Sequence, residues 1–210
     1  ASNGTISATG TATVNNLQAN TSVLTGSVTA NTVVTTANLV AGVISSSGTI
    51  TADKVQANTS ILTGTVTANT LVQSANVVST GSISAKDVVT SNTVNANTVI
   101  NAANVVAGAI SSSGTATVNN LQANTSIVTG SVTANTVITT ANLVTGVLSS
   151  SGAATVSRLQ ANSTITTGAL NANTLVVAAN VISNGAISAA GTVTSDKLQA
   201  NTSLLTGSIT

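Results

Sequence analysis

The chain of 210 residues contains no histidine, cysteine, methionine, proline, phenylalanine, tyrosine or tryptophan, and only 3% of its residues are charged. General acid–base catalysis needs a positioned titratable group, usually a histidine or a carboxylate, and nucleophilic triads need histidine or cysteine beside other groups. The three aspartates are the only carboxylate side chains, and they lie far apart in the sequence. We therefore expect no catalytic residues and interpret the protein as a non-enzyme.

The same absences restrict the ligands that the chain can bind. Soft metal sites need cysteine or histidine, and calcium loops need clustered carboxylates, so we expect no metal site and no cofactor. A net charge of +1 without aromatic rings offers neither attraction nor stacking to nucleic acid. No run approaches the ~18–20 apolar residues of a spanning helix, so we expect no membrane insertion.

What the sequence does contain is repetition. The phrase LTGSVTANT at 24–32 returns as LTGTVTANT at 62–70 and as VTGSVTANT at 128–136. One pattern of glycine spacing also occurs twice, at Gly10, Gly26, Gly42 and Gly48 and again at Gly114, Gly130, Gly146 and Gly152. It defines a repeat unit of about 38 residues, a period typical of solenoid proteins. One unit, near 81–108, is shortened. We therefore expect residues 1–210 to form one continuous repetitive segment.

A finer period runs beneath this unit, because one large aliphatic residue recurs every five or six positions from Ile6 to Ile209. This ladder has seven steps in each full unit, and it is interrupted only by Ala12, Ala116 and Ala154. The spacing fits neither a heptad nor a helical period. Its early members are Leu17, Val23, Val28, Val33, Leu39, Ile44, Ile50, Val55, Ile61, Val66, Leu71 and Val77.

Short strands joined by corners explain this spacing. In SVTAN, alternation places Val28 and Ala30 on one face and Ser27 and Thr29 on the other. Asparagine tolerates left-handed backbone, and glycine relieves tight turns, so both are expected at corners. The pattern predicts an all-β protein, an elongated β-helix or β-solenoid with sides of five to six residues. Corner asparagines at 20, 31, 38, 58, 69 and 76 are expected to stack or bond between turns.

Two architectures share this ladder. In a single-chain three-sided solenoid, three steps close one turn of about 16–17 residues, and the whole chain rises only about 60 Å. In an intertwined homotrimer each chain supplies one side per level, and the fibre rises about 180 Å. Seven steps are not a multiple of three, so repeat units of a lone solenoid fall on different sides. We therefore favour the homotrimer and keep the solenoid as the alternative.

The chain resembles the shaft repeats of bacteriophage tail fibres, especially those of marine phages. The resemblance lies in the phrases VTANTLV at 66–72, TGSVTAN at 25–31 and SSSGTIT at 45–51, and in the period of the whole chain. It implies a homotrimeric β-structured fibre on a virion, with a receptor-binding tip outside this segment. The last residues, GSIT at 207–210, stop in mid-repeat, so we expect a segment of a longer fibre.

Two sets of polar residues are candidate contact sites. Charged residues occupy equivalent slots before a ladder residue, as in Asp53-Lys54 and Asp196-Lys197, and we interpret them as outward corners that tolerate any polar residue. Lys86, Asp87 and Arg158 complete the charged set. Asn-x-Ser/Thr motifs occur at Asn3, Asn20, Asn58, Asn124, Asn162 and Asn201, and composition alone accounts for them.

The function that we expect is a structural shaft, a rigid spacer in a phage or virus tail fibre. The second hypothesis is an extracellular filament or cell-surface adhesin built from a solenoid, and both place the chain on a virion or outside a cell. Ice binding ranks third, because it requires regular Thr-x-Thr ranks on one face. The outward slots of successive steps break such a rank, since they hold Gln18, Thr29, Ser45, Thr51 and Gln56.

Overall fold

The computed structural model describes residues 2–210, apart from the side chain of Thr140. Strands make up 87% of the chain, and no described residue is helical. The strands pair in parallel and stack as a β-solenoid of about 13 turns, which confirms the all-β prediction. The strands are β1 (Ile6–Ala19), β2 (Val23–Thr35), β3 (Asn38–Ser79), β4 (Ile83–Ala85), β5 (Val88–Ala96), β6 (Val99–Ala161), β7 (Thr164–Val177), β8 (Asn180–Ser183), β9 (Ile187–Thr194), β10 (Lys197–Ala200) and β11 (Leu204–Ile209).

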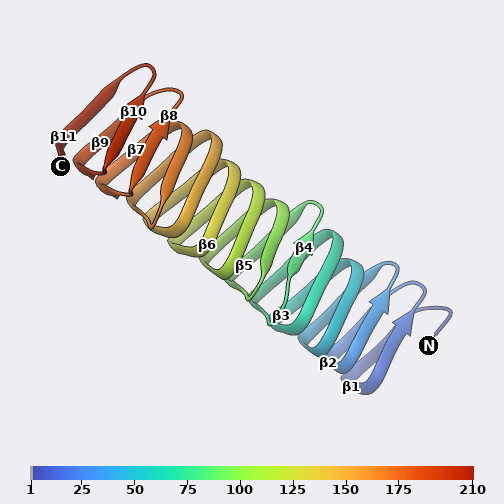
Figure 1. The fold of residues 1–210 in the computed structure, drawn as a ribbon. Helices are drawn as coiled ribbons and strands as arrows, with labels where there is room; N and C mark the ends of the chain where they lie inside the picture. The colour runs from blue at the N-terminus through green and yellow to red at the C-terminus, as the bar shows by residue number, and fades with distance from the viewer. Residues whose placement is uncertain (1) are drawn as a thin grey trace. The chain divides into compact units, whose positions relative to one another are not determined.

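The chain divides into two compact units, Ala1–Ala107 and Gly108–Thr210. In the first unit, β1 pairs with β2, β2 pairs with β3, and β3 pairs with β4 and β5. In the second unit, β6 pairs with β7, β7 with β8 and β9, β8 with β10, and β9 with β11. Within each unit, successive turns therefore lie side by side (Figure 1).

The strand register shows how one turn closes. Val28 is paired with Ala12 in the turn before it and with Ile44 in the turn after it. Other turns are longer by a single position, as the pairing of Val66 with Ile83 shows. Three ladder steps thus complete a turn, and a single chain supplies all three sides. This is the single-chain form of the solenoid, and the intertwined homotrimer stays a prediction.

The interior is lined by the aliphatic ladder. Members such as Val28, Ile44 and Leu143 are fully buried, and the residue two positions after each, such as Ala30, is a small inward side chain. Each buried aliphatic contributes roughly 1.5–3 kcal/mol to stability. Where alanine takes the place of a larger ladder residue, the second inward residue supplies the missing volume. Val118 follows Ala116 by two positions and is buried, at 6% exposure. Because the inward pair keeps its summed volume, the interior stays close-packed.

One ladder position was predicted wrongly. The sequence period predicts Leu71 inside, whereas the structure buries Val72 completely and leaves Leu71 half-buried. The phrase that precedes them, TANT, also occurs before Val33, which is buried while Val34 is 39% exposed. The same corner phrase therefore forms a five-residue side in one turn and a six-residue side in another.

Serine and threonine also occupy inward small slots, where a buried hydroxyl needs a partner. The Ser46 hydroxyl donates to the carbonyl of Asn31 at 2.8 Å, and the Ser150 hydroxyl donates to the carbonyl of Asn135 at 2.9 Å. Each bond reaches back to the preceding turn. Most polar small slots therefore tie neighbouring turns together, whereas the Ser74 and Thr167 hydroxyls are buried without a partner.

The corners do not use left-handed backbone. No described residue, glycine or other, has a positive φ, so the expected reason for asparagine and glycine at corners is wrong. Glycine is required there for space. A Cβ at Gly42 would lie 2.6 Å from the carbonyl oxygen of Gly26 in the preceding turn, and a Cβ at Gly64 would lie 2.6 Å from that of Gly48.

The glycine contacts also show how the seven-step repeat unit fits a three-sided coil. Gly26 and Gly42 continue one column above Gly10, whereas Gly48 lies against the carbonyl of Asn31 and starts the next column. Each unit of seven steps therefore advances by one side of the coil. This shift is the reason for which the sequence favoured the homotrimer over a single-chain solenoid. The coil accommodates this shift because every side holds the same kind of inward pair.

The steric role of glycine yields the first prediction. Replacing Gly42 with alanine inserts a Cβ against backbone, and overpacking of this kind costs about 1–3 kcal/mol. We expect a lower midpoint in urea unfolding, monitored by circular dichroism. Gly10→Ala is the matched control, because its Cβ meets no atom within 4 Å. Equal midpoints for the two variants would contradict the steric explanation.

Candidate functional site

The charged residues do not assemble into a chemical site. Asp53 and Lys54 are half-buried, and the other five are exposed. None of the seven forms a salt bridge in the described part of the chain, and no group of three potential metal-ligating side chains occurs among the described residues. The structure therefore does not bring the three aspartates into one place where they could act together.

Two of the charged slots share one backbone geometry. The amides of Asp53 and Lys54 both donate to the carbonyl of Ala37, at 2.9 and 3.2 Å. The amides of Asp196 and Lys197 likewise both donate to the carbonyl of Ala179, at 3.0 and 3.1 Å. The repeat thus places both pairs at the same kind of corner, as the sequence predicts. The corner is held by main-chain groups, and the charged side chains are not needed to form it.

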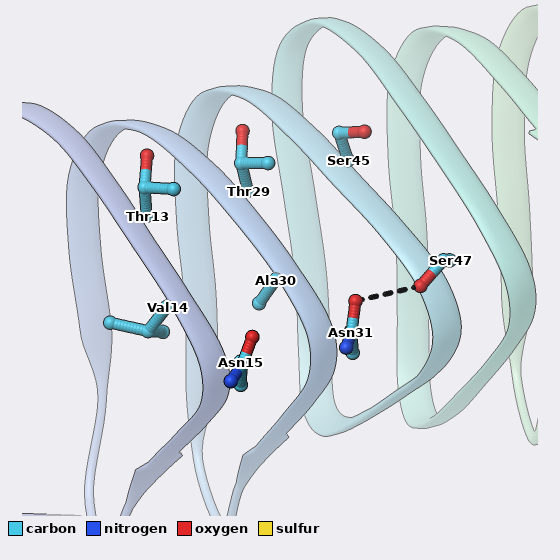
Figure 2. A pocket seen from close by; sticks show the side chains of 8 residues that line it. All are labelled: Thr13, Val14, Asn15, Thr29, Ala30, Asn31, Ser45 and Ser47. Atoms are coloured by element: carbon cyan, nitrogen blue, oxygen red, sulfur yellow. Dashed lines mark hydrogen bonds between the residues drawn. The ribbon is translucent and has the colours of Figure 1, made fainter.

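Asparagine side chains link turns at other corners, where they accept hydrogen bonds from serine or threonine of the next turn. The Ser47 hydroxyl donates to Asn31 Oδ1 at 3.0 Å (Figure 2). The Thr32 hydroxyl donates to Asn16 Oδ1 at 2.7 Å. Of the six corner asparagines predicted to stack or bond, Asn31 makes such a side-chain bond. These contacts are structural, since they consume the polar groups involved.

One hollow in the first unit is open to solvent. It has a volume of about 500 Å³ and is formed by three successive turns around Thr29 and Asn31. Thr13, Thr29 and Ser45 project from equivalent positions in these turns (Figure 2). A similar hollow of about 490 Å³ in the second unit includes Asp196 and Ser195. The Ser195 hydroxyl there is buried without a partner.

Outward residues form ranks that follow the turns rather than the order of the chain. Thr29 is aligned with Thr13 and Ser45 on one side of the coil, and Thr51 is aligned with Val34 on the next side. Gln56 follows Val55 on the third side. The five residues that break the threonine rank along the chain are therefore divided among three sides. Thr29 and Ser45 share one side, Gln56 lies on another, and Gln18 and Thr51 share the third, where Val34 lies between them. Comparing each residue with the one a full turn later in the sequence would have revealed the true neighbours.

The asparagines of the Asn-x-Ser/Thr motifs are all exposed. At two of them the middle residue of the motif makes a hydrogen bond within the fold: the Thr59 hydroxyl donates to the carbonyl of Gly42 at 2.9 Å, and the Thr125 hydroxyl donates to that of Gly108 at 2.8 Å. These bonds give threonine a structural reason to follow asparagine at these two corners, and they do not involve the third residue of the motif.

Functional inference for this chain rests on the geometry of the coil. No protein-family model matches the chain, and neither a curated protein nor a solved structure matches it. Among the described residues, no helix has the length and apolarity required to span a bilayer. The candidate functional element is therefore the outer surface of the coil.

The corner geometry gives the second prediction. Lys54→Ser removes the charged side chain but keeps the amide, so stability should stay within about 0.5 kcal/mol of wild type. Lys54→Pro removes the amide that donates to Ala37 and restricts the preceding residue, so it should destabilise the coil markedly. Urea unfolding measures both variants. A large loss in the serine variant would show that the side chain itself is required.

Proposed function

We propose that this chain is a structural shaft segment, a stiff spacer within a phage or virus tail fibre. The observation that carries the proposal is the closed hydrogen-bonded coil in each unit, with a close-packed aliphatic interior. Its outer surface consists mainly of small polar side chains. In such a structure each added turn lengthens the shaft, and few backbone groups are left unpaired and open to cleavage by proteases.

Stiffness in each unit has a specific origin. Each turn donates and accepts backbone hydrogen bonds along its sides, and inward hydroxyls such as Ser79 add bonds at corners, here at 2.7 Å to the carbonyl of Gly64. Bending a unit would stretch these bonds and open the packed interior at the same time. A spacer needs this resistance, whereas an enzyme needs a cleft with converging reactive groups.

The resemblance to phage fibre repeats favours a virion location and a homotrimer, in which case a receptor-binding tip would lie outside this segment. The second candidate is an extracellular filament or a cell-surface adhesin. It is favoured by the register, because one chain closes every turn by itself, as the pairings of Val28 with Ile44 and of Val66 with Ile83 show. Both candidates use the coil as a spacer, and they differ in where it is displayed.

Immunogold electron microscopy separates the two candidates. Antibodies raised against the intact chain are expected to label thin fibres on purified virions. Labelling of host-cell surfaces without virions would contradict the phage proposal and support the filament or adhesin. Sedimentation analysis of the purified chain gives its mass, and three times the 20.1 kDa of one chain is the result that the homotrimer predicts.

A further inference from the structure

In each unit, one side of the coil carries hydroxyl groups around its buried ladder residues over several successive turns. In the first unit this side buries Ile50, Val66 and Ile83, and in the second unit it buries Ala116, Val132, Leu148 and Ile165. We call the outward residues of this side the hydroxyl face. Its hydroxyl-bearing members are Thr49, Thr51, Thr65, Thr67, Ser82 and Ser84 in the first unit, and Thr115, Thr117, Ser131, Thr133, Ser149, Thr164 and Thr166 in the second. Val147, beside Leu148, is the outward residue of these turns that has no hydroxyl, and it is 40% exposed.

The hydroxyl face is regular within each unit because the strand register aligns it. Thr67 is paired directly with Ser84 in the first unit, and Ser149 is paired with Thr166 in the second. The hydroxyls of Thr115 and Ser131, one turn apart, lie 3.3 Å from each other. Neighbouring turns are spaced about 4.8 Å apart, and outward residues two positions apart in a strand are about 6.5 Å apart. The face is thus a two-dimensional array of hydroxyls. Its rows are Thr-x-Thr at 49–51, 65–67, 115–117 and 164–166, Ser-x-Ser at 82–84 and Ser-x-Thr at 131–133, and Val147 interrupts the row of Ser149.

The outer rank of this face is free to bind. Thr51, Thr67, Thr117 and Thr133 are exposed, and their hydroxyls make no hydrogen bond with any other described residue. Threonine is branched at Cβ, so its side chain has few rotamers on a strand. The array is therefore preorganised, and little conformational entropy is lost when it meets a partner.

The chemistry of the face excludes the usual macromolecular partners. Protein interfaces depend on tryptophan, tyrosine and arginine anchors, and nucleic acids require clustered lysine and arginine. The chain has no aromatic residue, and none of its four basic residues belongs to the hydroxyl face. The face is therefore a rigid, uncharged array in which each hydroxyl can both donate and accept a hydrogen bond. Only a partner with a repeating hydrogen-bonding lattice can engage many of these groups at once.

We propose that the hydroxyl face binds the surface of ice. Ice presents ordered water oxygens at spacings of the same order as the array, and each bound hydroxyl adds to the others because all are fixed on one rigid support. The threonine methyl groups gain further by leaving liquid water. This inference depends on the fold and the residues of one side, and it is independent of a role in a fibre.

The test uses the intact chain and measures thermal hysteresis together with the shape of ice crystals. The wild-type chain is expected to lower the freezing temperature of ice below its melting temperature and to produce faceted ice crystals. The double variant Thr67→Tyr with Thr133→Tyr, one change in each unit, should lose this effect. The matched control, Gln73→Tyr with Gln122→Tyr, changes exposed outward residues on another side and should keep it.

Circular dichroism and urea midpoints establish that each variant is folded. If the tyrosine variant does not fold, Thr67→Lys with Thr133→Lys replaces it with the same expected loss. The proposal is overturned if wild type shows no hysteresis and unaltered crystals at high concentration. Equal loss in the control variant overturns it as well. Binding to crystalline cellulose without any effect on ice would replace it with a polysaccharide-binding role.

Discussion

The stacking of inward aliphatic side chains in successive turns holds this protein together. Each inward aliphatic lies above another one turn away, as Ile44 lies above Val28, and the backbone between them is bonded in parallel register. Burial and hydrogen bonding reinforce each other here, because the register that pairs the backbone is also the register that packs the interior. The chain contains no cysteine for a disulfide and no aromatic residue for a packed cluster, so this repeated contact carries the stability.

This constraint leaves the outer surface free to vary. The interior fixes only the ladder residue and the small residue two positions later, while the outward neighbours contribute little to packing. Outward positions therefore hold glutamine, threonine, serine, a charged residue or an exposed aliphatic such as Leu24 or Leu62 at little structural cost. A function of the coil must then arise from rigid spacing or from a rank of outward groups, and the proposed shaft and the proposed ice-binding face use these two properties.

The sequence predicted the all-β solenoid and the inward ladder because a five-to-six-residue period is compatible with few other structures. It placed Leu71 inside in place of Val72, since the same corner phrase serves sides of two lengths and the choice depends on the turns above and below. It also missed the steric role of glycine, because Gly42 meets Gly26 only when the turns are stacked. The hydroxyl face was missed for a related reason: its neighbours lie a full turn apart in the sequence and alternate with residues of the other two sides.

The pairing of adjacent turns within one chain is the claim on which the rest depends, and a disulfide cross-link tests it most directly. Gln73 and Thr90 are paired across adjacent turns, and the natural chain has no cysteine to interfere. Oxidation of Gln73→Cys with Thr90→Cys should form a bond within a single chain, since paired strands lie within disulfide reach. In an intertwined homotrimer the two positions of one chain would be about 14 Å apart, three levels away from each other. Failure of this intrachain bond to form would contradict the single-chain coil.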